Sequence, residues 1–161
     1  MLSLSVAALL EKMRDAAQHA RSRAGSDQKS LIKKFYSDKG IRRRVQLLFH
    51  PDVVKALTTI WLAADTDGSQ FIEKDEYLVM HRKLVLALDP STRPQYAFKA
   101  AEEDWEKDSE GKTGLDKDRF FWCWFELADL WTDSVSPRAY VTFLTVRLPH
   151  LPSCPSILLC A

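Results

Sequence analysis

Residues 65–76 read DTDGSQFIEKDE, and this acidic segment decides how the rest of the chain is interpreted. Five of its twelve side chains are carboxylates, at segment positions 1, 3, 9, 11 and 12, and an isoleucine stands at position 8. Carboxylates at this density repel one another unless a cation collects them. Hard divalent cations bind about six to eight oxygen atoms, which a loop supplies from alternating positions and from a final two-oxygen carboxylate. The alternative is an acidic helix–turn–helix that holds no ion.

The spacing of the oxygen-bearing residues predicts one ion site in this segment. Two aspartates and a serine stand at positions 1, 3 and 5, a backbone carbonyl would serve at position 7, and glutamates stand at positions 9 and 12. The glutamate at position 9 would act directly or through a water molecule. The predicted metal ligands are Asp65, Asp67, Ser69, the carbonyl oxygen of Phe71, Glu73 and Glu76.

The segment resembles an EF-hand of the calmodulin superfamily, which implies Ca²⁺ as the bound ion, with Mg²⁺ as the alternative. That family has apolar residues eight, five, four and one positions before the first ligand, where this chain has Leu57, Ile60, Trp61 and Ala64. The resemblance also implies that Ile72 forms a short β bridge to a sister loop. One departure is Gln70, because the family normally has glycine there for a positive φ. The strain costs about 1–2 kcal/mol, so we expect an affinity of about micromolar or weaker.

A second acidic run, EKDSEGKTGLDKDR, is the expected sister loop. With Leu115 at position 8, the loop spans residues 108–119, and the helix that follows carries Phe120, Cys123, Trp124 and Leu127 at the family's apolar positions. The ligands are lost, however, because Lys112 stands at position 5 and Arg119 at position 12. A register that begins at Asp104 also fails, since it puts Leu115 at position 12. We therefore expect a metal-free partner loop whose Leu115 meets Ile72.

Apolar residues recur at helical spacing through most of the chain, which predicts an all-α protein. We expect a basic N-terminal helical extension over residues 1–50, an EF-hand pair over residues 51–131, and a C-terminal helix with an apolar tail over residues 132–161. An apolar seam over residues 2–20 predicts a helix that packs on its own domain, because three heptads are short for a coiled coil. A break is expected near Gly40. The last helix should be capped by Ser136, start at Pro137 and end near Leu148.

The charge is distributed unevenly along the chain. Residues 1–64 carry twelve basic and five acidic residues, whereas residues 65–131 carry nine and sixteen. Either the two halves face each other or the front half meets an acidic partner. The segment Lys29–Arg44 concentrates the positive charge, and its candidate partners are tubulin, anionic lipid and nucleic acid, of which nucleic acid is the least favoured. The basic residues assigned to partner binding are Arg42, Arg43 and Arg44.

The helix expected after the second loop is aromatic around most of its girth. Its rings cannot all face one core, so either the chain's own helices cover them or another protein does. In the second case the rings would be rigid anchors for a lasting partner. The aromatic residues assigned to partner binding are Phe121, Trp122 and Phe125.

Two functions are therefore expected. The first is a calcium-binding EF-hand adaptor that docks onto a larger protein assembly, and the second is a metal-independent scaffold whose basic segment 29–44 binds an acidic partner. FELADLWT and AYVTFL are similar to EF-hand proteins of flagellated eukaryotes, which implies a cytoskeletal, microtubule-associated or ciliary assembly. We expect no enzyme, because no phosphate-cradling loop or nucleophile elbow is present. Three cysteines without a secretory signal, and no membrane span, favour the cytoplasm.

Overall fold

The computed structural model describes residues 37–132 and 134–146, and these residues are mostly helical, as the sequence predicts. The expected helix within residues 2–20, the lysines of segment 29–34 and the apolar tail from residue 147 lie outside the described residues. The elements in chain order are α3 (Asp38–Leu48), α4 (Pro51–Ala64), β1 (Ile72–Glu73), α5 (Lys74–Leu88), α6 (Pro94–Ser109), β2 (Gly114–Leu115), α7 (Lys117–Trp131) and α8 (Pro137–Val146).

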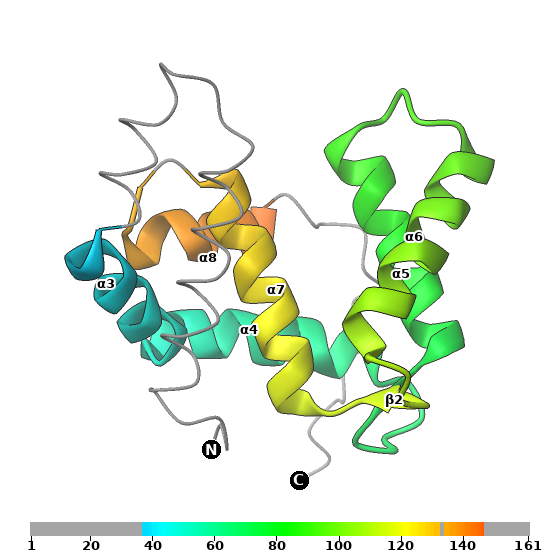
Figure 1. Cartoon of the computed structure of the whole chain (residues 1–161), viewed down its shortest axis with the longest axis horizontal. Coiled ribbons are helices and arrows are strands. Elements are labelled where there is room, and N and C mark those ends of the chain that lie inside the picture. Colours follow the sequence, from blue (N-terminus) through cyan, green and yellow to red (C-terminus); the bar gives the residue numbers. More distant parts are fainter. Residues whose placement is uncertain (1–36, 133, 147–161) are drawn as a thin grey trace, which may run out of the picture.

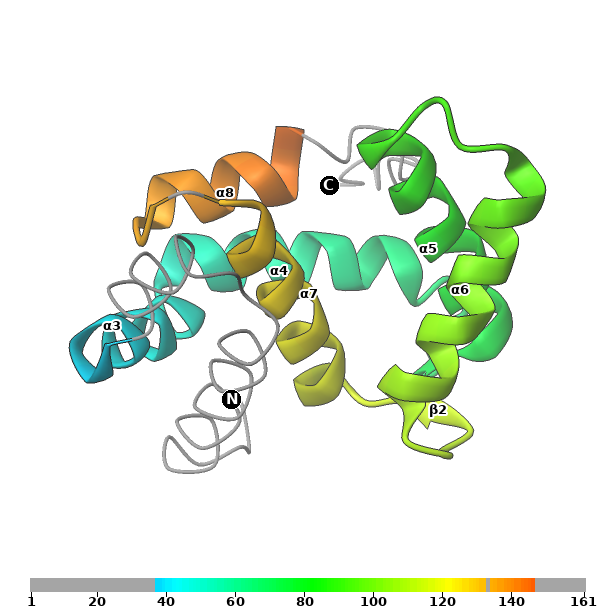
Figure 2. The same cartoon turned by 45° about the horizontal axis from the view of Figure 1, so that its top comes forward.

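Helices α5 and α6 lie side by side at one end of the molecule, α3 and α8 lie at the other, and α4 runs from α3 and α8 toward α5 (Figures 1 and 2). Helix α7 begins beside the α5–α6 pair and runs to the far end, where it packs on α8. The strands β1 and β2 form a two-stranded antiparallel sheet, in which Ile72 pairs with Leu115 and Glu73 with Gly114. The sheet thus joins the two residues that the sequence predicts to meet.

Capping residues explain where the helices begin. Pro51, Pro94 and Pro137 each stand in the first turn of a helix, where the missing N–H costs no hydrogen bond. Ser136 accepts a hydrogen bond from the amide of Ala139 at 3.3 Å, as expected for a capping serine. Gly40 itself lies inside α3, which begins at Asp38 with Ser37 accepting from the amide of Gly40 at 3.2 Å. Most of the helix expected before Gly40 lies outside the described residues.

The core is built from both faces of α7 and from the helices around it. Trp61 of α4 meets Phe120 of α7 edge to face, with ring centroids 5.3 Å apart. Deeper along α7, the ring of Phe125 lies 5.1 Å from that of Tyr140 on α8. The apolar side of α3 belongs to the same core. Helix α3, which falls within the expected extension 1–50, is therefore packed against the helices that follow it.

A buried polar cluster connects α3, α7 and α8 inside this core. The Nε atom of Arg44 donates to Oδ1 of Asp129 at 2.6 Å, and the hydroxyl of Tyr140 donates to the same oxygen. Arg44 is only 2% exposed. Both burial and the nearby carboxylate of Asp129 raise the pKa of Tyr140, so the phenol stays protonated and remains a donor.

Among the described residues, no single helix is long and apolar enough to cross a membrane. Helices α3 and α4 reach the necessary length and composition only when they are taken together across a bend of 56°.

Candidate metal centre

The first loop, residues 65–76, brings three carboxylates together at the end of α4. Asp65 caps α4, and its amide donates to the carbonyl of Trp61 at 2.9 Å. One oxygen each from Asp65, Asp67 and Glu76 lies within 4.8 Å of the other two. Asp65 is 9% exposed, and its Oδ1 atom is buried without a hydrogen-bond donor among the described residues. A buried carboxylate oxygen without a donor is costly, and no described side chain offsets that cost at Asp65.

Hydrogen bonds within the first loop hold the carboxylate of Glu76 in place. Its Oε1 atom accepts from the amide and the hydroxyl of Thr66, both at 2.7 Å. Its Oε2 atom accepts from the amide of Glu73 at 3.3 Å. Glu76 belongs to the first turn of α5, where the helix dipole also favours a negative charge. The carboxylate at position 12 is therefore preorganised near the two aspartates at positions 1 and 3.

The turn between these carboxylates is stabilised by its own side chains. The Oδ1 atom of Asp67 accepts from the amide of Ser69 at 2.9 Å, and the hydroxyl of Ser69 donates to the carbonyl of Phe71 at 2.9 Å. Gln70 has a φ of 69°, as its position in the loop predicts. This is left-handed geometry, which is strained for a residue with a side chain.

The charges of the first loop influence one another. The amide and hydroxyl of Ser69 hold the pKa of Asp67 below its usual value, so that carboxyl stays ionised. The negative charge of Asp67 in turn raises the pKa of Glu73, with smaller contributions from desolvation and from Glu76. The loop's own cation, Lys74, pairs with Glu106 of α6 at 3.3 Å, so the carboxylates of this loop form no ion pair with a described residue.

The structure brings together only some of the predicted ligands. Asp65, Asp67 and Glu76 form the cluster, whereas Ser69 and the carbonyl of Phe71 are bonded to each other. The side chain of Glu73 is exposed and does not belong to the cluster. Thr66 was not predicted as a site residue from the sequence. Its amide and its hydroxyl are the two donors that bond the carboxylate of Glu76.

The second loop, residues 108–119, has a guanidinium at the matched last position. The Nε atom of Arg119 donates to the carbonyl of Asp108 at 2.8 Å, and a second nitrogen lies 3.4 Å from the carbonyl of Lys107. A third nitrogen pairs with Oε1 of Glu110 at 2.7 Å. Arg119 thus binds the end of α6 and the acid at position 3 together. The sequence predicts that Arg119 disables this loop as an ion site, but it does not reveal these partners.

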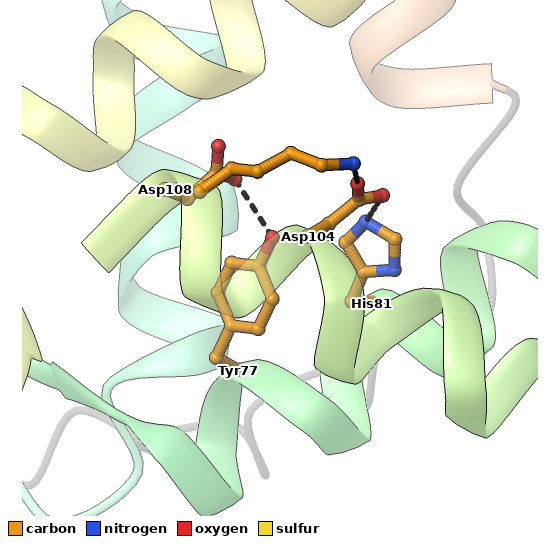
Figure 3. A network of polar contacts seen from close by, with 5 residues as sticks. Tyr77, His81, Asp104 and Asp108 are labelled. Carbon is orange, nitrogen blue, oxygen red and sulfur yellow. Dashed lines mark hydrogen bonds and ion pairs between the residues drawn. The ribbon is translucent and has the colours of Figure 1, made fainter. Parts of the chain in front are cut away.

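The carboxylate of Asp108, at position 1 of the second loop, is also occupied. Figure 3 shows it beside Tyr77 of α5, whose hydroxyl donates to its Oδ2 atom at 2.7 Å. Burial and the charge of Asp108 raise the pKa of Tyr77, so the phenol remains a donor. The same figure shows His81 beside Asp104, with Nε2 and Oδ2 3.1 Å apart. These contacts tie α5 to α6 and leave Asp108 engaged with a protein donor.

His81 is partly buried against this network, and its buried Nδ1 atom has no partner among the described residues. Burial lowers the pKa of His81, while the charges of Asp104 and Asp108 oppose that shift. The net direction favours the neutral ring. A neutral ring also suits the stacking of His81 on Tyr77, where the ring centroids lie 5.3 Å apart. His81 therefore has a packing role between α5 and α6.

The residues assigned to partner binding divide into two groups. Arg42 and Arg43 are exposed on α3. Arg44 was expected on the same basic surface, and this is wrong, because it is buried and ion-paired with Asp129. Its spacing from the buried Ile41 and Leu48 is the signal that it shares their helix face. The aromatic residues of α7 assigned to the same role are buried in the core, which agrees with the alternative that the chain's own helices cover them: Phe121, Trp122 and Phe125.

Comparison of the chain with protein-family models, with curated proteins and with solved structures found no significant match.

Proposed function

We propose that this chain is a calcium-binding EF-hand protein, in which the first loop binds one ion and the second loop binds none. The observation that carries the proposal is the cluster of Asp65, Asp67 and Glu76 with its donor-free buried oxygen. All three are hard oxygen donors, which suit Ca²⁺ or Mg²⁺ and not a soft transition metal. Ser69, the carbonyl of Phe71 and Glu73 complete the donor set at positions 5, 7 and 9. The ion supplies positive charge to the clustered carboxylates, which form no ion pair with a described residue, since Lys74 of the same loop pairs with Glu106.

The pairing of the two loops supports the same proposal. Ile72 and Leu115 join two helix–loop–helix units through β1 and β2, so a change in one loop reaches the other. Such a pair has no chemistry of its own, and a bound ion acts by biasing how the helices pack. We propose that the protein is an adaptor that docks onto a larger protein assembly. The exposed apolar side chains of Leu130 (76%) and Trp131 (52%) at the end of α7 support a docking role.

Calorimetric titration with Ca²⁺ tests the ion site. We expect heat that corresponds to one ion per chain, and we expect Glu76→Gln to abolish it. The matched control is Glu110→Gln in the second loop, which removes a carboxylate but should leave the heat unchanged. Absence of heat in the wild-type protein would contradict the proposal. Heat that survives Glu76→Gln would also contradict it, because the ion would then lie elsewhere.

A second function is supported by the exposure of Arg42 and Arg43 on α3. Here the helical scaffold is independent of metal, and the basic segment 29–44 binds an acidic partner such as tubulin. Binding that rests on such contacts weakens steeply as salt is raised. Co-sedimentation with microtubules at two salt concentrations, with Arg42→Gln/Arg43→Gln as the test variant, distinguishes this function. Salt-insensitive binding, or binding unchanged in the variant, would argue against it.

A further inference from the structure

A groove with a volume of about 720 Å³ lies between α4 and α8, and no residue of either loop lines it. The two helices run side by side in Figure 2 and pack directly on each other. Ala56, which is 4% exposed, and the half-buried Val141 form an apolar part of the wall. The volume lies within the range of about 300–1,000 Å³ that is usual for ligand pockets. The groove is therefore large enough for a few side chains of a partner.

The rim of this groove is basic. Lys55 of α4 and Arg138 of α8 both line it and are exposed, and neither forms an ion pair with another described residue. His50 lines the same end, and its Nδ1 atom accepts from the amide of Asp52 at 3.3 Å, so the rim has two bases against one acid, Asp52. The first turns of both helices border the groove, so their positive dipole ends add to the side-chain charges. The electrostatics of the rim favour an anionic occupant.

The uneven charge of the chain argues for an acidic protein segment from outside. Residues 1–36 carry seven basic and three acidic residues, and the only charged residue after 146 is Arg147. Neither terminal segment therefore complements a basic rim. The middle of the chain, residues 65–131, carries sixteen acids against nine bases and would repel an acidic partner. An acidic partner is thus steered toward the end that holds the groove.

We propose that the groove between α4 and α8 binds an acidic segment of a partner protein. Carboxylates of that segment pair with Lys55 and Arg138, and an aliphatic side chain between them packs on Ala56 and Val141. The inference rests on the docking role proposed above and names the chemical class of the partner. It makes no use of the ion, so it stands or falls separately from the calcium site.

The test is a calorimetric titration of the full chain, in chelator, with a short peptide of repeated Glu-Glu-Leu units. We expect binding that weakens as salt is raised, and no binding of the matched Lys-Lys-Leu peptide. Lys55→Gln/Arg138→Gln should weaken binding by about fivefold to tenfold, since each exposed ion pair contributes at most about 1 kcal/mol. Thr142→Trp places a bulky side chain on the groove wall without changing charge, and should abolish binding. Both variants are checked for an unchanged melting temperature.

The matched control is Arg82→Gln/Arg93→Gln, which removes two exposed charges outside the groove lining. It should leave the affinity within about twofold. Arg42→Gln/Arg43→Gln is measured beside it, and loss of binding in that variant, with Lys55→Gln/Arg138→Gln unaffected, would overturn the proposal in favour of the α3 surface. Absence of peptide binding, or binding insensitive to Thr142→Trp, would also overturn it. A concentration-dependent dimer that Lys55→Gln/Arg138→Gln dissociates would instead make a second copy the occupant. Failure of the calcium titration leaves all these outcomes unchanged.

Discussion

The two loops follow one plan and end in opposite charges. Each contributes its position-8 residue to the small sheet, and each has an acid at position 9 directly before a helix. The helices start at matched positions, Lys74 and Lys117. At position 12 the first loop has Glu76 and the second has Arg119. The difference supports the proposal that a loop of this plan holds a cation, which would come from solution in the first loop and is the Arg119 guanidinium in the second.

The backbone of the two loops differs along with the charge. In the first loop, positive φ occurs at Gly68 (74°) and Gln70 (69°), which are positions 4 and 6. In the second loop it occurs at Glu110 (51°) and Gly111 (78°), which are positions 3 and 4. Helix α6 runs on to Ser109, so its carbonyls lie within reach of Arg119. In the loop that contains the Arg119 guanidinium, the left-handed residues therefore stand earlier, at positions 3 and 4. Thr113 at position 6 is not left-handed.

The largest expected effect comes from making the second loop resemble the first. Lys112→Asp/Arg119→Glu supplies oxygen at positions 5 and 12 and removes the cations that stand at those two ligand positions. We expect the number of calcium ions bound per chain to rise from one to two, measured by calorimetry. In chelator the double variant should be less stable than the wild type, because unpaired acids remain without Arg119.

The matched control for this conversion is Lys112→Asp alone. It adds an oxygen donor at position 5 but keeps the guanidinium at position 12, so the stoichiometry should stay at one. If circular dichroism shows the double variant to be folded with calcium and yet only one ion binds, the comparison of the loops is wrong. The carboxylate of Asp108, engaged by Tyr77, would then be the stronger restraint on the second loop.

A smaller effect is expected when Arg119 is simply removed. Arg119→Gln loses bonds to two carbonyls and to Glu110, and its side chain is 18% exposed. We expect the free energy of unfolding to fall by about 2 kcal/mol, since charged hydrogen bonds contribute about 1.5–3 kcal/mol before solvent screening. The measurement is urea unfolding in chelator.

Glu76→Gln, under the same conditions, is the comparison for Arg119→Gln. Its cost should be near zero to about 1 kcal/mol, because weaker bonds to Thr66 are offset by relief of repulsion with Asp65 and Asp67. Equal losses in the two variants would show that position 12 has the same structural role in both loops and that the cation argument fails.

Much of this comparison could be predicted from the sequence, because the relevant signals are local. The helices follow from apolar spacing and from prolines in first turns, and the pairing of Ile72 with Leu115 follows from two loops placed in one register. The strain at Gln70 follows from its position alone. Local geometry is fixed by neighbours in the chain, and those neighbours are visible in the sequence.

The contacts that the sequence did not predict connect residues far apart in the chain. Arg44 was placed in a basic surface segment because its neighbours Arg42 and Arg43 are charged, yet its carboxylate partner is Asp129, on α7. The aromatic girth of α7 is covered by α4 and α8, which depends on how those helices pack. The groove between α4 and α8 likewise brings together residues that lie far apart in the chain. Tertiary packing decides such partners, and no local pattern encodes them.

Substitutions at position 6 test the backbone difference between the loops, with smaller expected changes in the free energy of unfolding. Gln70→Gly relieves left-handed strain, so we expect the free energy of unfolding to rise by about 1 kcal/mol and calcium to bind up to about fivefold more tightly. Thr113→Gly is the matched control, because Thr113 is not among the residues with positive φ. It should destabilise the protein by about 0.5–1 kcal/mol through lost backbone order. Thermal unfolding and calorimetry measure both, and a gain from Thr113→Gly would contradict the assigned backbone difference.

The smallest expected effect is a change in the pKa of Glu73, which the neighbouring carboxylates of the first loop raise. Asp67 is the main cause of the raised pKa of Glu73, whereas the matched acid of the second loop, Glu110, is paired with Arg119. Asp67→Asn should therefore lower the pKa of Glu73 toward its ordinary value of 4.5, measured by the carboxyl chemical shift in chelator. A raised pKa means that the folded chain holds this proton more tightly than the unfolded chain does. The contribution of Glu73 to stability thus falls as pH rises through that pKa, and Asp67→Asn should reduce the dependence.

Asp75→Asn is the control for that titration, because Asp75 raises the pKa of Glu73 less than Asp67 does. Its effect on the Glu73 resonance should be the smaller of the two. Addition of Ca²⁺ to the wild-type protein should lower the pKa of Glu73 at least as far as Asp67→Asn does, since a divalent charge outweighs the loss of one carboxylate. A pKa of Glu73 that stays raised in saturating Ca²⁺ would show that the ion does not neutralise the carboxylates of the first loop. The proposed parallel between a bound ion in the first loop and Arg119 in the second would then be wrong.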